Sequence, residues 1–161
     1  MNLRIGHGID IHKLSSGIPL ILGGIKIESI VGIEWHSDGD VIIHALVDAL
    51  LGALSLGDIG KFFPSSDKQW KNEDSTLFLV KTFDKIVQHQ YKICNIDINV
   101  ILQEPEIRQH ITPMKQKIST ILDINLNAIS IKATTTDYLG FIGKGCGIAA
   151  TATVLIAKDE N

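Results

Sequence analysis

The sequence predicts an α/β protein of the α+β sandwich kind, in which helices pack over one face of a mixed β-sheet. Three observations lead to this fold class. Apolar residues alternate at two-residue spacing in several segments, as in strands, and recur at three- and four-residue spacing in others, as in amphipathic helices. These segments follow one another in the order β-β-α-α-β-α-β-β. No repeat, linker or low-complexity segment divides the chain, so we expect a single domain over residues 1–161.

The first two expected strands span residues 3–13 and 18–28, joined through Ser-Ser-Gly. Apolar residues alternate in both segments, which predicts an antiparallel pair. The two faces of the first strand carry different side chains, with Ile5, Ile9 and Ile11 on one face and Gly8, Asp10 and His12 on the other.

Residues 38–54 have helical spacing, and Ser37, Asp38 and Asp40 are candidate N-terminal caps. The apolar residues of this segment run almost all the way round the helix, so we expect it to be buried. After it, residues 57–72 contain glycines, a proline and serines that break every period. A loop of this length inside a domain is typical of a lid or a binding segment.

A second helix is expected over residues 75–90, beginning at an Asp74/Ser75 cap. Its expected apolar face consists of Leu77, Val80, Phe83, Ile86 and Val87. Four more elements follow: a strand at 94–103, a helix from Thr112 and Pro113 to Leu122, and two strands at 129–136 and 147–157. The last strand is rich in Ala, Gly and Thr, so we expect a close neighbour against it, with another subunit as one candidate.

Composition narrows the class of protein. The net charge is −3 and no basic run is present, so nothing indicates a nucleic-acid or anionic-membrane partner. The only cysteines, Cys94 and Cys146, form no CxxC motif, which favours a reducing compartment and two small core residues. No apolar run approaches the roughly 18 residues of a membrane helix, and the N-terminal segment lacks a secretory apolar region. We therefore expect a soluble cytoplasmic protein.

Asp10, His12 and His44 form a candidate metal site. Residues at i and i+2 of a strand point to the same side, so Asp10 and His12 can converge, and the buried helix brings His44 towards the sheet. In an alternative interpretation, the histidines are hydrogen-bonded core residues and Asp10 caps a turn. The metal interpretation is favoured because an uncompensated buried carboxylate or imidazole costs several kcal/mol, and a bound Zn²⁺ would satisfy all three groups.

Other polar residues near this helix allow two interpretations each. Asp48 lies one turn after His44, where it could orient the imidazole or be a polar residue at the helix edge. Asp38 and Asp40 are better explained as helix caps than as ligands. His36 and Ser37 precede the helix, where free backbone N–H groups favour a phosphate.

A second polar cluster lies at the end of the strand at 129–136. Thr134, Thr135 and Thr136 followed by Asp137 could hold phosphate oxygens and a hard cation, although threonine is also a common strand residue. Asp58 could accept hydrogen bonds from ribose hydroxyls or could cap a turn.

Four segments, GHGIDIHKL, HSDGDVIIHALVDALLGALSLGDIGKFFP, KATTTDYLGFIGKG and GIAATATV, together resemble the 2-C-methyl-D-erythritol 2,4-cyclodiphosphate synthase family. The resemblance covers nearly the whole chain. It implies conversion of 4-diphosphocytidyl-2-C-methyl-D-erythritol 2-phosphate to the cyclic diphosphate with release of CMP, a phosphorus–oxygen lyase reaction of the non-mevalonate isoprenoid pathway. It also implies a homotrimer with sheets around the central axis and active sites between subunits.

The resemblance assigns roles to individual residues. It implies that Asp10, His12 and His44 bind one Zn²⁺ per subunit and that Asp137 binds a Mg²⁺ or Mn²⁺ held with the substrate diphosphate. The implied catalytic residues are His36 and Thr135. The implied substrate-binding residues are Asp10, His12, His36, Ser37, Asp58, Ile59, Gly60, Phe63, Pro64, Ser65, Ser66, Asp67, Leu102, Gln103, Glu104, Pro105, Glu106, Ile107, Arg108, Thr134, Thr135, Thr136, Asp137, Phe141 and Lys144.

The chain departs from the family pattern at several positions. Asp137 stands where the family usually has Glu, and Ser65 and Glu106 replace a frequent acidic or proline residue and a frequent Lys. Lys144 and Cys146 stand where the family often has Arg and Glu, in a region that in some relatives binds an isoprenoid diphosphate on the trimer axis.

Two other functions are compatible with the same residues. A metal-dependent nucleotide diphosphate hydrolase would use the same metals but deliver a bound water. A structural zinc site in an oligomeric scaffold is disfavoured because only three protein ligands are evident, whereas structural zinc usually has four.

Overall fold

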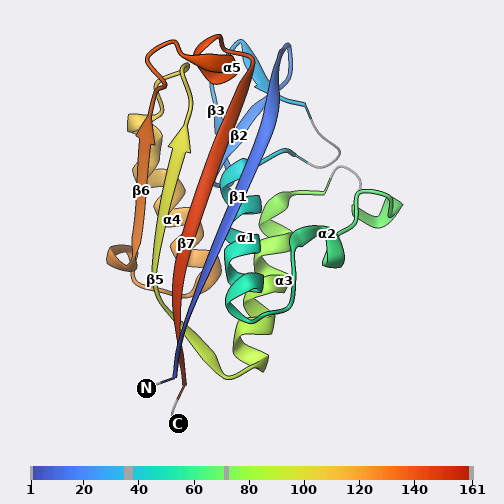
Figure 1. The fold of residues 1–161 in the computed structure, drawn as a ribbon, viewed down its shortest axis with the longest axis vertical. Helices are drawn as coiled ribbons and strands as arrows, with labels where there is room; N and C mark the ends of the chain where they lie inside the picture. The colour runs from blue at the N-terminus through green and yellow to red at the C-terminus, as the bar shows by residue number, and fades with distance from the viewer. Residues whose placement is uncertain (1, 35–37, 71–72, 160–161) are drawn as a thin grey trace.

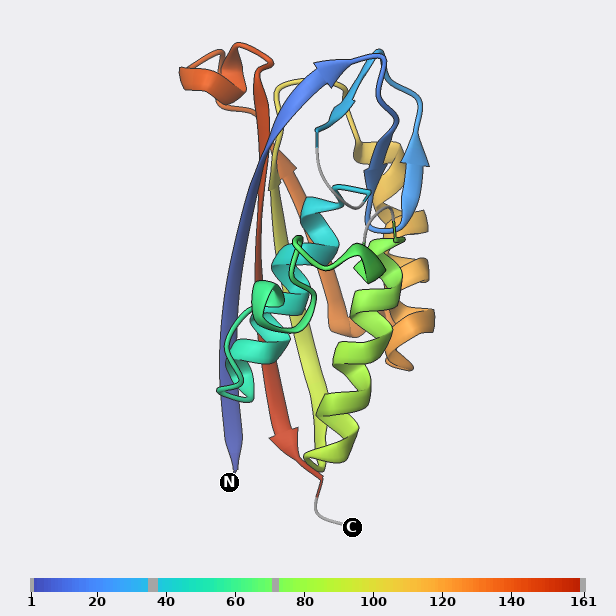
Figure 2. The same cartoon turned by 90° about the vertical axis from the view of Figure 1, so that its right-hand side faces the viewer.

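The protein has two layers, a mixed β-sheet and a set of helices that cover one of its faces (Figure 1 and Figure 2). The computed structural model describes residues 2–34, 38–70 and 73–159. The strands of the main sheet lie in the spatial order β4 (Val31–Ile33), β1 (Leu3–Ser16), β7 (Gly147–Lys158), β5 (Tyr91–Ile101) and β6 (Ile129–Thr134). Strands β5 and β6 are parallel, and the other neighbouring pairs are antiparallel. The α+β architecture with a mixed sheet is confirmed.

Three long helices form the second layer. They are α1 (Val41–Ala53), α3 (Ser75–Gln88) and α4 (Ile111–Leu122). The shorter elements are α2 (Ile59–Phe62), α5 (Gly140–Gly143) and the 3₁₀ turns η1 (Lys68–Trp70), η2 (Arg108–His110) and η3 (Leu126–Ala128). No helix in the described part of the chain is both long and apolar enough to cross a bilayer.

Helix α1 lies directly on the central strands β1 and β7. A Cβ atom added at Gly6 would stand 1.8 Å from the carbonyl oxygen of Ala49, and one at Gly8 would stand 2.1 Å from that of Ala45. On β7, Ala150 and the neighbouring small residues of the same face are fully buried. The close neighbour expected of the last strand is therefore helix α1 on this face, and the small residues let the helix approach the sheet.

The prediction of one strand over residues 18–28 was wrong. This segment contains two short strands, β2 (Leu20–Leu22) and β3 (Ile25–Ile27), which pair with each other in a separate hairpin. Gly23 and Gly24 make the turn with φ angles of 58° and 73°, the pair of positive values that a two-residue type I′ hairpin requires. The strand that pairs with the C-terminal part of β1 is β4.

The expected burial of α1 is confirmed, and Asp40 is its N-cap. Asp40 Oδ1 accepts hydrogen bonds from the backbone N–H groups of Ile42 and Ile43, both at 3.1 Å. The same carboxylate accepts the N–H groups of Gly23 and Gly24, so it also ties the β2–β3 hairpin to the helix. Burial raises the pKa of Asp40 to about 6, although these backbone donors act in the opposite direction.

Two other expectations about burial were wrong. In α3, Val80 and Val87 are exposed, because the helix packs through a face that includes the small polar residues Ser75 and Thr82. Cys94 and Cys146 are both free and exposed rather than small core residues, because Cys94 lies on the solvent side of β5 and Cys146 precedes β7 in the turn after α5. The segment predicted to be a loop contains α2 and η1.

Candidate active site

Three potential metal ligands meet between β1 and α1. Asp10 Oδ2 lies 3.0 Å from His12 Nε2 on the same strand and 3.0 Å from His44 Nδ1 on the helix. The three ligand atoms all lie within 4.8 Å of one another. One carboxylate oxygen and two imidazole nitrogens suit a divalent metal such as zinc, and three protein ligands leave a position open for another ligand.

Burial and hydrogen bonding shift the pKa values of Asp10 and His44 in this cluster. Burial raises the pKa of Asp10, but hydrogen bonds with His12 and His44 outweigh burial and hold this pKa well below its usual range. Burial lowers the pKa of His44, but the hydrogen bond to Asp10 and the nearby carboxylates raise it above its ordinary value. Asp10 therefore stays ionised, and its carboxylate is the negatively charged ligand that a divalent cation would require.

The imidazole of His44 also contacts the first residue of α3. His44 Nε2 lies 2.8 Å from Ser75 Oγ, and Ser75 is fully buried. Ser75 in turn donates two hydrogen bonds to Asp38, from its backbone N–H at 2.9 Å and from its hydroxyl group. Asp38 was predicted to cap α1, but its carboxylate instead accepts hydrogen bonds from Ser75 at the start of α3. Ser75 was missed as a site residue, since the sequence indicated only that it begins a helix.

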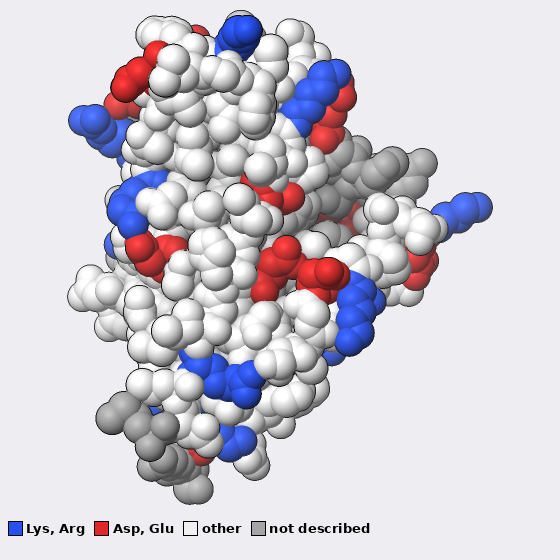
Figure 3. Space-filling view, viewed as in Figure 1, with Lys and Arg blue, Asp and Glu red and all other residues white. Residues whose placement is uncertain are grey.

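Two more acidic residues, Asp48 on α1 and Asp58 before α2, bind backbone N–H groups of α2. Asp48 Oδ1 accepts a hydrogen bond from the backbone N–H of Ile59 at 2.6 Å, and Asp58 Oδ1 accepts one from Lys61 N–H at 3.0 Å. Both carboxylates therefore fix the short helix α2, and Asp58 is its N-cap. Burial raises the pKa of Asp48, with partial compensation from the Ile59 N–H. In the space-filling view, acidic side chains gather between β1 and α2 (Figure 3).

The segment after α2 is anchored by aromatic side chains. Phe63 is buried and stacks on Phe78 of α3, with 4.6 Å between ring centroids. Trp70 packs edge-on against Phe63 at 5.1 Å. Of the other residues that the resemblance assigned to substrate in this segment, Pro64 is half-buried, and Ser65, Ser66 and Asp67 are exposed. These polar side chains are open to a ligand while the aromatic rings hold the segment in place.

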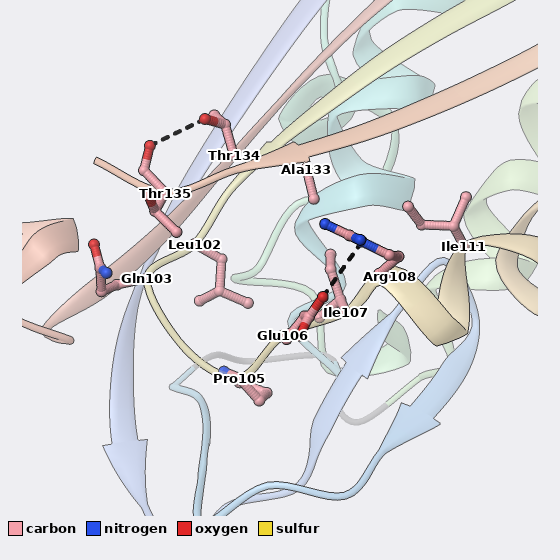
Figure 4. A pocket seen from close by; sticks show the side chains of 10 residues that line it. All are labelled: Leu102, Gln103, Pro105, Glu106, Ile107, Arg108, Ile111, Ala133, Thr134 and Thr135. Carbon is pink, nitrogen blue, oxygen red and sulfur yellow. Dashed lines mark hydrogen bonds and ion pairs between the residues drawn. The ribbon is translucent and has the colours of Figure 1, made fainter. Parts of the chain in front are cut away.

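A pocket of about 330 Å³ opens where β5 and β6 end (Figure 4). Its lining consists of Leu102, Gln103, Pro105, Glu106, Ile107, Arg108, Ile111, Ala133, Thr134 and Thr135. Six of the seven residues expected in the nucleotide segment therefore line one cavity, and Glu104 does not. Sequence reasoning missed Ile111 and Ala133, which enter the lining only through the packing of α4 and β6. Arg108 Nε lies 3.3 Å from Glu106 Oε1, and both side chains are largely exposed.

The threonine cluster lies at the rim of this pocket. Thr135 Oγ1 donates to Asp137 Oδ1 at 3.3 Å, and Thr136 Oγ1 donates to the carbonyl oxygen of Leu139 at 2.8 Å. Asp137, Phe141 and Lys144 are exposed. His36 and Ser37, for which a catalytic role and phosphate contacts were predicted, lie outside the described residues.

The fold and these two regions define a class: an α+β protein with a candidate divalent-metal site and, elsewhere on the same chain, a pocket large enough for a small-molecule ligand. Comparison with known proteins narrows this class. A family model described as the YgbB family matches residues 3–157, and the chain belongs to this family.

Curated relatives match the chain over nearly its whole length. A 2-C-methyl-D-erythritol 2,4-cyclodiphosphate synthase of Haemophilus ducreyi is 50% identical over 156 residues, which make up 97% of this chain and 98% of that protein. The synthase of the same name from Francisella philomiragia is 51% identical over 159 residues, or 98% of this chain and 100% of that protein.

Solved structures of relatives share the fold. The bifunctional IspDF of Campylobacter jejuni superimposes with a TM-score of 0.92 and 40% identity, covering 96% of this chain and 42% of that longer chain. The IspF of Plasmodium falciparum, in a complex with CDP, gives a TM-score of 0.88 and 40% identity, covering 99% of this chain and 98% of that chain.

Proposed function

We propose that the protein converts 4-diphosphocytidyl-2-C-methyl-D-erythritol 2-phosphate to 2-C-methyl-D-erythritol 2,4-cyclodiphosphate and CMP. The convergence of Asp10, His12 and His44 on one point, in a chain that belongs to this family, is the observation that carries the proposal. In the reaction, an oxygen of the 2-phosphate forms a bond to the β-phosphorus. The bond from that phosphorus to the bridging oxygen breaks, and this oxygen leaves with CMP.

The attacking phosphate oxygen is already an anion, so the protein needs no general base for this step. The residues instead position the two phosphates and stabilise the developing charge. We assign transition-state stabilisation to His36 and Thr135, as the family resemblance implies. The hydroxyl group of Thr135 is exposed at the pocket rim, where a phosphate oxygen can reach it.

The donor set of Asp10, His12 and His44 fits Zn²⁺, and we propose one such ion per subunit. When bound, the ion supplies Lewis-acid stabilisation and a fixed orientation for a substrate phosphate. For a Mg²⁺ or Mn²⁺ held with the diphosphate, we propose Asp137 as the protein ligand. Its carboxylate is exposed beside Thr135 and offers the oxygen donor that hard cations prefer.

The pocket at the ends of β5 and β6 is our proposed cytidine site. Its walls combine the buried apolar side chains Leu102 and Ile107 with the polar groups of Gln103 and Arg108. By family resemblance, Asp58, Ile59 and Gly60 contact the ribose and residues 63–67 hold the methylerythritol. Phe141 and Lys144 complete the substrate contacts that we propose.

We further propose a homotrimer with active sites between subunits. In one chain, β7 and β5 separate the metal-site strand β1 from the outer pocket strand β6, a span of about 14 Å at normal strand spacing. The face of β1 turned away from the helices exposes Ile5, Ile9 and Ile11, which is an unusual apolar stripe for a solvent-facing strand. A neighbouring subunit would cover this stripe and bring a second pocket towards the metal site.

The protein should be tested with the cytidine substrate, Zn²⁺ and Mg²⁺, with products followed by phosphorus NMR and His44→Ala as the control. We expect CMP and a cyclic diphosphate with the wild type and neither with His44→Ala. Linear phosphate products would favour the hydrolase, which gains no support from the relatives described above. Loss of both metal and trimer in His44→Ala, with no nucleotide binding by the wild type, would favour a structural zinc site.

We also propose that the chain is one domain working in the cytoplasm. The two free, exposed cysteines suit a reducing compartment.

A further inference from the structure

A buried serine connects the candidate metal site to helix α3. Ser75 is the first residue of α3 and has no exposed surface, and its hydroxyl oxygen lies 2.8 Å from His44 Nε2. The ring nitrogen that faces Asp10, Nδ1, is the one on the metal side. The two nitrogens of one imidazole therefore have separate partners, one at the metal position and one in the protein interior.

The hydrogen-bond direction along this connection is set by Asp38. The Ser75 hydroxyl donates to Asp38 Oδ1, and the Ser75 backbone N–H donates to Asp38 Oδ2. Asp38 Oδ1 also accepts the backbone N–H of Asp40 at 3.2 Å. A hydroxyl group has one proton, so a serine that donates to a carboxylate can only accept from the imidazole. His44 Nε2 must then be the protonated nitrogen.

We propose that Ser75, held by Asp38, is a positioning residue that keeps His44 in the tautomer with Nε2 protonated and its Nδ1 lone pair directed at the metal. This inference rests on the proposed metal site. Metal-ligating histidines commonly donate their second N–H to a carboxylate or carbonyl group. Here the imidazole donates to a serine hydroxyl, and that hydroxyl donates to a carboxylate. Neither the family match nor the relatives' names assign this role to Ser75.

The connection also couples two elements of the fold. Asp38 precedes α1, which carries His44, and Ser75 begins α3, which follows the segment with Phe63 and Trp70. Phe78, one turn after Ser75, packs its ring 6.3 Å from that of His44. Ser75 donates two hydrogen bonds to the Asp38 carboxylate, which fixes its position. The His44 imidazole therefore contacts a buried residue at the start of a helix rather than a mobile side chain at the surface.

The test is the affinity of Ser75→Ala for Zn²⁺ and Co²⁺, measured by competition with a chelator. The variant keeps the backbone bond to Asp38 and the Asp74 cap of α3, so we expect it to fold. Loss of an outer partner of a metal-bound histidine typically weakens metal binding by about 10- to 100-fold, and we expect a loss in this range. Thr82→Val is the matched control, because it removes another fully buried hydroxyl from the same helix and should change affinity by less than about twofold.

A second measurement does not depend on the variant's folding. In the zinc-loaded wild type, proton–nitrogen NMR should show a His44 Nε2–H that exchanges slowly with solvent, and Ser75→Ala should speed this exchange. Wild-type affinity in Ser75→Ala, or rapid Nε2–H exchange in the wild type, would overturn the positioning role. The His44→Ala variant distinguishes a failure of the Ser75 proposal from a failure of the metal-site proposal. If this variant binds metal as the wild type does, the proposed metal site is wrong.

Discussion

Gly8→Ala tests whether the close approach of α1 to β1 creates the metal site. A Cβ at this position would lie 2.1 Å from the carbonyl oxygen of Ala45, the residue after His44, and 2.8 Å from the backbone nitrogen of Ala49. These neighbours are helix backbone and cannot turn away as a side chain would. To restore the 3.4 Å of an ordinary contact, α1 must move by about 1.3 Å.

This displacement is large against the tolerance of a metal site. Ligand distances in such sites hold to about ±0.2 Å, so moving His44 by about 1 Å should weaken Zn²⁺ binding by more than tenfold. Overpacking should also lower the free energy of unfolding by at least about 1–3 kcal/mol. Chelator competition and chemical denaturation of the metal-free protein measure the two effects separately.

Gly52→Ala is the matched control, since it makes the same substitution near the end of α1. Apart from the adjacent residues and the helix backbone, the nearest described atom to an added Cβ is the carbonyl oxygen of His7, at 4.0 Å, and the position is exposed. We expect it to raise the free energy of unfolding by about 0.5–1 kcal/mol through helix propensity and to leave metal affinity unchanged. If Gly8→Ala behaves like Gly52→Ala in both assays, the helix position does not depend on the glycine and the reasoning is wrong.

Three further predictions concern stability, pH and assembly. Thr82→Val should raise the free energy of unfolding by about 1 kcal/mol in denaturant titrations, because Thr82 Oγ1 is buried with no hydrogen-bond partner among the described residues; a loss of stability would refute this. Asp40 has a folded-state pKa of about 6, above its ordinary value of 3.8, so its favourable contribution is complete below pH 4 and is lost as pH rises through 6. Relative to Asp40→Asn, the wild type should lose about 2 kcal/mol of unfolding free energy between pH 4 and pH 7, whereas a pH-independent difference would contradict the shift. Ile9→Asp should give a monomer in analytical ultracentrifugation and remove most activity, and a fully active monomer would refute the shared active site.

The sequence was sufficient to predict that Asp10, His12 and His44 meet, because these residues lie on regular elements. Asp10 and His12 share a face of β1 through two-residue alternation alone, and an all-apolar helix such as α1 has to pack on the sheet. Which atoms meet depends on the separation of the two layers, which the glycines of β1 set. The contact of His44 with Ser75 joins residues 31 positions apart, and no periodicity in the sequence indicates it.

The errors in the predicted fold have local physical causes. The apolar residues Leu20, Leu22, Ile25 and Ile27 change parity at the Gly23–Gly24 dipeptide, which is a signal for a hairpin rather than for one strand. In α3, no comparable signal was available. Its packing face combines the apolar residues Phe78, Leu79 and Ile86 with the small polar residues Ser75 and Thr82, whereas hydrophobicity alone favoured the exposed valines.

The metal site and the core of this protein are parts of one arrangement. Glycines bring α1 close enough for His44 to reach Asp10, and this closeness also buries the His44 imidazole and partly buries the Asp10 carboxylate. In the metal-free state the cost of burying the carboxylate is offset by hydrogen bonds with His12 and His44. A divalent cation could bind here with little rearrangement of the chain, because the ligand atoms are already within 4.8 Å of one another. The ligand geometry therefore comes from the backbone packing of α1 against β1, which is in place before any metal binds.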